Sequence, residues 1–410
     1  MTSRERVMAS MNYREPDRVP VDFGGHRSSG IAVQAYKKLR EYLGLKPSEL
    51  YVYDVVQQLA VVEDDVLDLF GADVVMLGYE FYRKPEYWKE WRMHDGTEVK
   101  IPKAVDIRKN NEGDYIIFSP KGEPGSIQKK SCLYFEQTLF PYYGSDDREF
   151  LNVADELMEI MWWHVECPPG PNSIGEKGRL AKELRANTDR AIYGIFGGGL
   201  IEPGEMGFRM DNFLMEMALD PERIATFLDK LLDYHMVNLE KYLKVVGPHI
   251  DIIGFSDDLG MQSGPQISPQ MYDELFKPRY QRMWSLVKEK APHIRICLHC
   301  CGSIYALLPS LIDAGLDSFN PVQTTCFNME PERLKGKFKD RITFWGGGCD
   351  TRWVLSHGST EDVEQNVREN IEKFREGGGF IFQQVHNILA DVPPENIVAM
   401  FEAAKKYGQY

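Results

Sequence analysis

The stretch IRICLHCCGSIYALLPSLIDAG, residues 294–315, sets the fold of this chain. Its first six residues, 294–299, form a short apolar run of the kind that makes a buried strand. The residues that follow have the apolar spacing of a helix, and Gly315 is a typical helix end. A buried strand followed closely by a helix is the repeating unit of a parallel sheet.

The same unit recurs along the chain. Eight strands that alternate with helices predict a closed (β/α)8 barrel, an α/β fold, and we expect 1–410 to form a single domain of this kind. The other seven strand candidates are residues 18–23, 72–77, 190–196, 249–255, 316–321, 341–346 and 379–384.

Residues 79–150 interrupt this alternation. They contain EWRMHDGTEVKIP and DYIIFSPKGEPGS, in which Asp95-Gly96 and Lys121-Gly122 indicate tight turns between antiparallel strands. We expect a β-rich insertion after the second strand, within the barrel domain, that covers part of the barrel mouth. Its many aromatic side chains either wall an apolar pocket there or only pack against one another.

The composition excludes several classes of partner. The 410 residues carry a formal charge of −14, whereas nucleic acids and anionic membranes both bind basic surfaces, so we expect neither as main partner. We find no signal-peptide pattern and no apolar run of roughly 18 residues, the length that spans a membrane. We therefore expect a cytoplasmic protein with reduced cysteines.

Polar residues follow nearly every strand candidate. In a (β/α)8 barrel the active site is built at the carboxyl ends of the strands, so these residues are candidates for it. Adjacent acids such as those at 257 and 258 can also simply cap a helix or hold a loop. The catalytic candidates are Glu202, Asp257 and Asp258, and the substrate-binding candidates are Asp22, His26, Gln262, Asn320, Gln323 and Asp350. For Asn320, Gln323 and Asp350 the alternative is contact with a metal ligand instead of with substrate.

His299 and Cys301 suggest a metal site. Alternate residues of a strand point to the same face, and imidazole and thiolate are both good zinc ligands. Cys300 points the other way, into the helix layer, and Cys297 lies deeper in the barrel, so we expect both to be core. Three protein ligands and one open position are typical of catalytic zinc. The candidates for the third ligand are His386 and Cys349.

Four segments together resemble the uroporphyrinogen decarboxylase superfamily. They are SRERVMASMNYREPDRVPVDFGG (3–25), HCCGSIYALLPSLIDAGLDSFNPVQ (299–323), CDTRWVLSHGSTEDV (349–363) and GGGFIFQQVHNILADVPPENIVAMFEA (377–403). The decarboxylases of this superfamily use no metal and bind substrate propionates with arginines in the loop after the first strand. Here that loop reads GGHRSSG and keeps only Arg27.

The other branch of the superfamily consists of corrinoid-dependent methyltransferases. Its members hold zinc with a His-x-Cys pair and a distant third ligand, usually cysteine. His299 and Cys301 match the pair, and His386 stands at the third position, so the resemblance implies zinc at these three residues. Cys349 as third ligand, or no metal at all, remain alternatives.

The resemblance also implies an activity and partners. It implies transfer of a methyl group from a small donor, with a methoxylated aromatic ether favoured, to the cob(I)alamin of a separate corrinoid protein, and it suggests a homodimer. DYHMVN (233–238) lacks the glycine of an Asp-x-His-x-x-Gly corrinoid signature, so we expect the cobalamin on a partner. The alternatives are a metal-independent decarboxylase or lyase and a non-catalytic small-molecule-binding protein.

Overall fold

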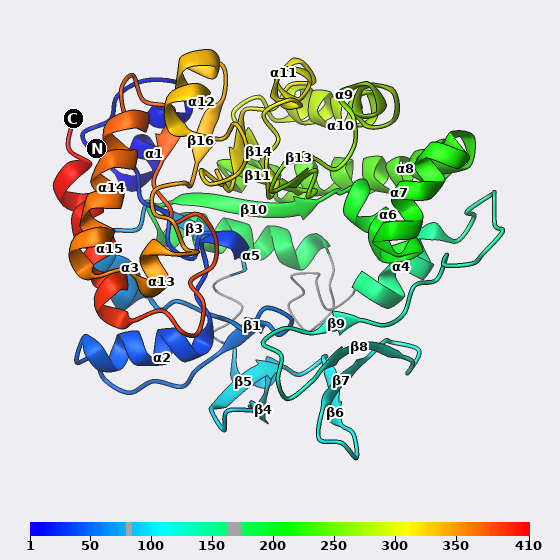
Figure 1. The fold of residues 1–410 in the computed structure, drawn as a ribbon, viewed down its shortest axis with the longest axis horizontal. Helices are drawn as coiled ribbons and strands as arrows, with labels where there is room; N and C mark the ends of the chain where they lie inside the picture. The colour runs from blue at the N-terminus through cyan, green and yellow to red at the C-terminus, as the bar shows by residue number, and fades with distance from the viewer. Residues whose placement is uncertain (79–83, 162–173) are drawn as a thin grey trace.

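The computed structural model describes residues 1–78, 84–161 and 174–410. At its centre is a curled parallel sheet of seven strands in the described chain, in the order β17-β16-β15-β14-β11-β10-β3. Figure 1 shows helices packed around it. The sheet strands are β3 (Val74–Met76), β10 (Ala191–Gly197), β11 (Ile252–Ser256), β14 (Arg295–His299), β15 (Ser318–Asn320), β16 (Thr343–Trp345) and β17 (Phe380–Ile381).

Residues 18–23 occupy the eighth side of the barrel. Val21 forms a parallel bridge with Phe382 after β17, and the Asp73 N–H donates to the Val21 carbonyl at 2.7 Å. This segment is less regular than the strand that the sequence predicts there, because Pro20 has no N–H to donate to a neighbouring strand. The alternating strands and helices confirm the predicted (β/α)8 architecture.

The helices follow the strands around the outside of the barrel. Between α9 and α10 the chain makes a π-helical turn over Tyr272–Phe276. The helices are α1 (Ser3–Met11), α2 (Val33–Tyr42), α3 (Asp64–Phe70), α4 (Val153–Met161), α5 (Ile174–Asn187), α6 (Ile201–Phe208), α7 (Met210–Leu219), α8 (Pro221–Val245), α9 (Pro269–Met271), α10 (Lys277–Lys290), α11 (Leu308–Asp313), α12 (Pro331–Phe338), α13 (Val354–His357), α14 (Thr360–Phe374) and α15 (Pro394–Tyr407).

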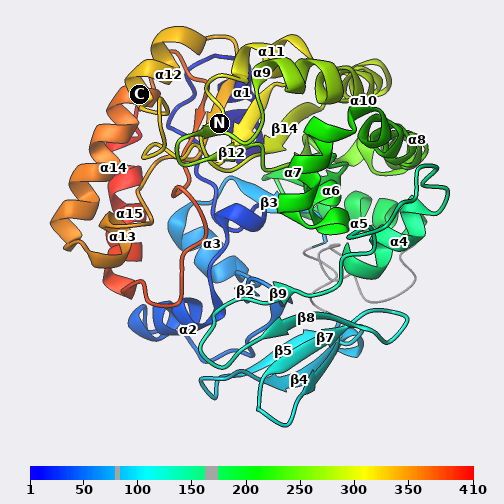
Figure 2. The same ribbon diagram turned by 45° about the vertical axis from the view of Figure 1, so that its right-hand side comes forward.

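Antiparallel strands lie between β3 and β10 in sequence and gather at one side of the molecule, as Figure 2 shows. β4 pairs with β5, and β6 to β9 form a separate four-stranded sheet. Residues 79–83, where the predicted insertion begins, lie outside the described residues. The antiparallel strands between β3 and β10 are β4 (Trp88–Arg92), β5 (Glu98–Pro102), β6 (Asp106–Lys109), β7 (Tyr115–Phe118), β8 (Pro124–Gln128) and β9 (Glu136–Gln137). Two further antiparallel pairs lie elsewhere in the chain, β1 (Val52–Asp54) with β2 (Leu59–Ala60) and β12 (Gly260–Met261) with β13 (Gly264–Pro265).

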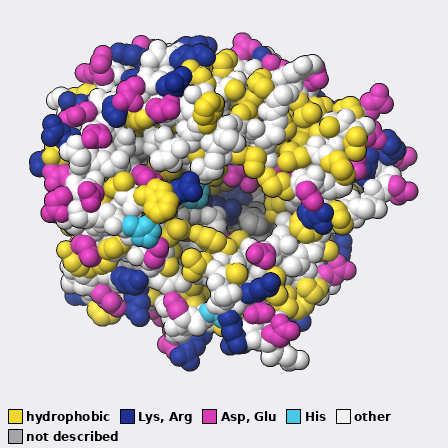
Figure 3. Space-filling view, viewed as in Figure 1, with side chains coloured by type: hydrophobic (Ala, Val, Ile, Leu, Met, Phe, Trp, Pro, Cys, Tyr) yellow, Lys and Arg dark blue, Asp and Glu magenta, His cyan; other side chains and the backbone are white. Residues whose placement is uncertain are grey.

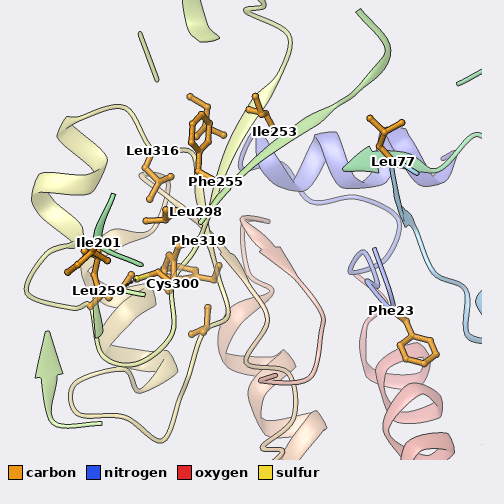
Figure 4. Packing of buried hydrophobic residues seen from close by; sticks show 14 of the residues in the cluster. Phe23, Leu77, Ile201, Ile253, Phe255, Leu259, Leu298, Cys300, Leu316 and Phe319 are labelled. Carbon is orange, nitrogen blue, oxygen red and sulfur yellow. Dashed lines mark hydrogen bonds between the residues drawn. The ribbon is translucent and has the colours of Figure 1, made fainter. Parts of the chain in front are cut away.

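The core has two layers separated by the sheet. Cys297 belongs to a small cluster with Tyr193 and Trp345 inside the barrel, whereas Cys300 belongs to the larger cluster between strands and helices. In Figure 4 Cys300 lies near Phe319, on the neighbouring strand β15. Both cysteines are fully buried, which confirms the prediction that they are core residues on opposite faces.

Three acids hold the amino-terminal end of the barrel. Asp73, Asp251 and Asp317 each precede a strand and each accepts a backbone N–H from a neighbouring barrel segment at 2.8 Å. Asp73 also forms ion pairs with Arg6 and Arg18. These acids lie opposite the carboxyl ends of the strands and have a structural role.

In the described residues we find no helix that is both long and apolar enough to cross a membrane.

Candidate metal centre

His299, Cys301 and His386 come together at the carboxyl end of the barrel. One ligand atom from each lies within 4.8 Å of the other two. The Cys301 Sγ is 3.6 Å from the His299 Nε2, and the two imidazole rings have centroids 5.9 Å apart. His299 ends β14 and His386 follows β17, so barrel closure joins residues that are distant in sequence.

Cys349, the alternative third ligand, is turned away from this cluster. It is fully buried, and its Sγ faces the Asp350 carbonyl at 3.9 Å. Burial raises the pKa of the Cys349 thiol, as it does that of the Cys301 thiol, so orientation and not protonation distinguishes the two cysteines. The geometry therefore favours His386.

The protonation states of the three side chains suit a metal. Desolvation lowers the pKa of His386 to about 4, helped by the neighbouring His299, and desolvation also lowers the pKa of His299. Both rings are therefore neutral at pH 7 and each keeps a lone pair for coordination. Burial and then the charge of Asp258 raise the pKa of the Cys301 thiol, so a metal ion would displace its proton on binding.

Asp257 and Asp258 are adjacent in sequence but have different surroundings. Asp257 is fully buried, and its carboxylate accepts the backbone N–H groups of residues 200–202 at 2.5–2.8 Å and the hydroxyl of Tyr280. These contacts cap the amino terminus of α6. Asp258 is partly exposed, accepts the Cys301 N–H at 2.7 Å and has Oδ1 3.7 Å from the His299 Nε2.

Two further acids stand on the first turns of α6. Burial raises the pKa of Glu202 well above its usual value, and repulsion by Asp258 and Asp257 adds to the shift. Burial and the same two charges raise the pKa of Glu205 to about 8. Glu205 therefore holds a proton at neutral pH, as a general acid must, and burial shifts the pKa of Glu202 in the same direction.

The substrate-binding candidates Asp22, His26 and Asn320 are buried. The Asp22 Oδ2 accepts the Trp345 indole N–H at 2.9 Å and lies 3.1 Å from the His26 Nε2. Asn320 is 0% exposed and its Oδ1 lies 3.3 Å from the His299 Nδ1. These three residues lie beneath the metal cluster, inside the barrel.

Gln262, Gln323 and Asp350 tie the loops of the same end together. The Gln323 Oε1 accepts the Gly302 N–H at 2.7 Å, next to Cys301, and the Gln262 Oε1 accepts from Arg352 at 3.1 Å. The Asp350 Oδ1 accepts the Arg352 backbone N–H at 2.8 Å. Only Gln323 is linked by these bonds to a residue beside the cluster.

The face drawn in Figure 3 is hollowed near its centre, and acidic and basic side chains are visible at the hollow. In the matching ribbon view, the loops near α13 lie on one side of this hollow and α6 on the other (Figure 1). Sequence reasoning missed two residues that support the site, Gln383 and Tyr280. Gln383 ends an apolar strand and could have been noticed, but Tyr280 lies in an ordinary helical pattern.

Comparisons with known proteins agree with this fold. The uroporphyrinogen decarboxylase (URO-D) family pattern matches residues 200–407, the half of the chain that carries the whole cluster. Curated relatives include the uroporphyrinogen decarboxylases of Synechocystis, 28% identical over 46% of this chain and 50% of the relative, and of Microcystis aeruginosa, 25% identical over 57% and 61%. The chain thus spans only about half of the first of these.

A solved structure has the same overall fold. The methyltransferase from Methanosarcina mazei superposes with a TM-score of 0.61, and the match covers 99% of both chains at 17% sequence identity. At that identity the likeness establishes the fold alone.

Proposed function

Because this chain belongs to the uroporphyrinogen decarboxylase family, and because it assembles a His-Cys-His cluster at the barrel mouth, we propose that it is a zinc-dependent methyltransferase. It moves a methyl group from a small donor, favoured to be a methoxylated aromatic ether, to the cob(I)alamin of a separate corrinoid protein. The observation that carries this proposal is the approach of the three ligand atoms to within 4.8 Å of one another.

The donor set fits a catalytic zinc ion. Two neutral imidazoles and one thiol that can lose its proton give three protein ligands, which leaves one position for a substrate oxygen. A set with a single thiolate leaves the metal more electrophilic than a set with two. Zinc bound there would act as a Lewis acid toward the donor oxygen.

The surrounding residues of the chain have separable roles in this proposal. Asp258 accepts the Cys301 backbone N–H at 2.7 Å and thereby holds the loop that carries this ligand. Burial raises the pKa of Glu202 and so favours its protonated form, and cleavage of a methyl ether leaves an oxygen that must gain a proton. Asp257, by capping α6, keeps Glu202 and Glu205 on the side of the helix near Asp258.

A corrinoid partner would need a surface beside the mouth. Met261, Phe327 and Trp353 are 50%, 62% and 63% exposed, and they follow β11, β15 and β16. The Phe327 N–H donates to the Gln262 carbonyl at 3.0 Å, and Arg352 donates to the side chain of Gln262, so the three loops meet. An exposed apolar rim of this kind supports docking of a protein at this end of the barrel.

Two experiments test the proposal. Protein purified without chelator should contain about one zinc per chain, and His386→Gln should lose it while the control His94→Gln in the insertion keeps it. The second experiment supplies a free corrinoid protein with a panel of methyl ethers and methylamines, and follows the Co(I) to methyl-Co(III) spectral change. Less than about 0.2 zinc per chain, not restored by added zinc, would refute the zinc-dependent activity.

The matched curated relatives support one alternative, a metal-independent decarboxylase or lyase, because they are named as uroporphyrinogen decarboxylases. In that case the protein would act equally well with and without zinc, and the acids Glu202 and Glu205 would carry the chemistry. Activity of metal-free protein on a carboxylated substrate would support this alternative over the methyltransferase.

A further inference from the structure

Two buried amides lie behind the metal cluster. Asn320 ends β15 beside His299, its register partner on β14, and Gln383 follows β17; both amides are 0% exposed. The Asn320 Nδ2 donates to the Trp345 carbonyl at 3.3 Å and to the Gln383 Oε1 at 2.6 Å. The Asn320 Oδ1 lies 3.3 Å from the His299 Nδ1.

Backbone carbonyls fix the orientation of both amides. A carbonyl oxygen can only accept, so the Trp345 carbonyl requires the NH2 group of Asn320 on its side and leaves the amide oxygen facing His299. The Gln383 Nε2 donates to the Ser28 carbonyl at 3.1 Å, which turns the Gln383 oxygen toward Asn320. Each amide therefore has an orientation that the other reinforces.

The orientation of Asn320 determines the state of the His299 ring. The amide oxygen carries no hydrogen, so it favours a hydrogen on the ring nitrogen that faces it, Nδ1, at 3.3 Å, whereas the other acceptor, the Asp258 Oδ1, lies farther from Nε2, at 3.7 Å. In a neutral imidazole the lone pair is then on Nε2, the nitrogen that lies 3.6 Å from the Cys301 Sγ. This is the nitrogen that a metal in the cluster would need.

We propose that Asn320 and Gln383 are positioning residues that hold His299 in its Nδ1–H tautomer and so direct its Nε2 lone pair into the cluster. The inference rests on the proposed function, because this tautomer serves a metal ligand. Of the two roles expected for Asn320, contact with substrate and contact with a metal ligand, it favours the second. The tautomer of the His299 ring therefore depends on contacts from four successive segments of the barrel. These are β15, β16, the residues that follow β17, and the loop containing Ser28.

The tautomer can be measured directly in the unaltered protein without zinc. Histidine labelled with 15N gives different long-range 1H–15N patterns for the two tautomers, and the His299 signals are those missing from His299→Gln. We expect the Nδ1–H pattern. An Nε2–H pattern would overturn the inference, and this measurement needs no variant of the amides.

Zinc affinity provides the second measurement, by competition with a chromophoric chelator. Asn320→Leu should weaken zinc binding by about 10- to 100-fold, and Gln383→Met should weaken it in the same direction by less. The control is Gln384→Met, since Gln384 is equally buried but donates to Gly30, away from the cluster. Equal zinc affinity of Asn320→Leu and Gln384→Met would overturn the inference.

The outcomes separate the two proposals. If the unaltered protein binds zinc and Asn320→Leu binds it with the same affinity, the positioning role is contradicted and the proposed methyltransferase function is unaffected. An Nδ1–H tautomer in a protein that binds no zinc contradicts the proposed function and retains the assignment of the tautomer. If Asn320→Leu does not fold, the tautomer in the unaltered protein and the Gln383→Met affinity decide the question.

Discussion

Glu205→Gln should change how the stability of the protein depends on pH. Burial and the charges of Asp257 and Asp258 raise the pKa of Glu205 from its usual 4.5 to about 8. Between these two values the folded state holds a proton that the unfolded state has released. The stability linked to Glu205 is therefore fully present below pH 4.5 and is lost as the pH rises through about 8. Glutamine has the shape of the protonated acid and does not titrate.

The size of the effect follows from the linkage relation. One group that titrates only in the unfolded state removes at most about 1.4 kcal/mol of the unfolding free energy per pH unit. Between about pH 5 and about pH 7.5 this limit is about 3.4 kcal/mol. Because Glu205 keeps some contact with solvent, we expect the unaltered protein to lose about 1–2 kcal/mol more than Glu205→Gln over this interval.

Urea unfolding at the two pH values measures this difference, and Glu41→Gln on the exposed surface of α2 is the matched control. The control should lose as much stability as the unaltered protein. If Glu205→Gln also lost as much, Glu205 would not be protonated in the folded protein, and the assignment of a proton-holding acid to α6 would be wrong.

Four other substitutions test three separate parts of the structure. Cys301→Ser should abolish zinc binding, whereas Cys300→Ser should leave zinc bound because Cys300 lies in the outer core layer. Metal analysis of both variants measures their zinc content. If both variants lost zinc equally, the assignment of the two cysteines to opposite faces of the strand would be wrong. Tyr280→Phe removes a buried donor to Asp257 and should lower the urea unfolding free energy by about 1–3 kcal/mol, and an unchanged midpoint would mean that this bond is not needed to hold α6. Trp353→Ser should weaken binding of the corrinoid protein by about tenfold in a titration while zinc content stays the same, and unchanged affinity would place the docking surface elsewhere.

The fold was predictable because its signals are local. The spacing of apolar residues over a short segment indicates whether it forms a strand or a helix, and the alternation of strands and helices is enough to predict a parallel barrel. The same local period separated Cys297 from Cys300, which the structure buries on opposite faces of the sheet. The segment 18–23 was less regular than predicted because Pro20 limits its hydrogen bonding.

The contrast between Asp257 and Asp258 was not predictable. Both acids follow the same strand, and nothing in the sequence tells which one faces the mouth. Asp257 meets the amino terminus of α6 and the hydroxyl of Tyr280, whereas Asp258 meets the Cys301 backbone. Each of these contacts joins parts of the chain that are more than twenty residues apart, so the packing of helices against strands decides them.

The sequence by itself determined the alternation of strands and helices and the pairing of His299 with Cys301 on one face, because both follow from the period of a single strand. Only the tertiary structure decided that His386 rather than Cys349 completes the cluster, and that Asn320 faces the His299 ring. Those relations depend on which strand ends meet when the barrel closes. Distances across a closed barrel are set by the register of all its strands together, and no single segment of sequence contains that information.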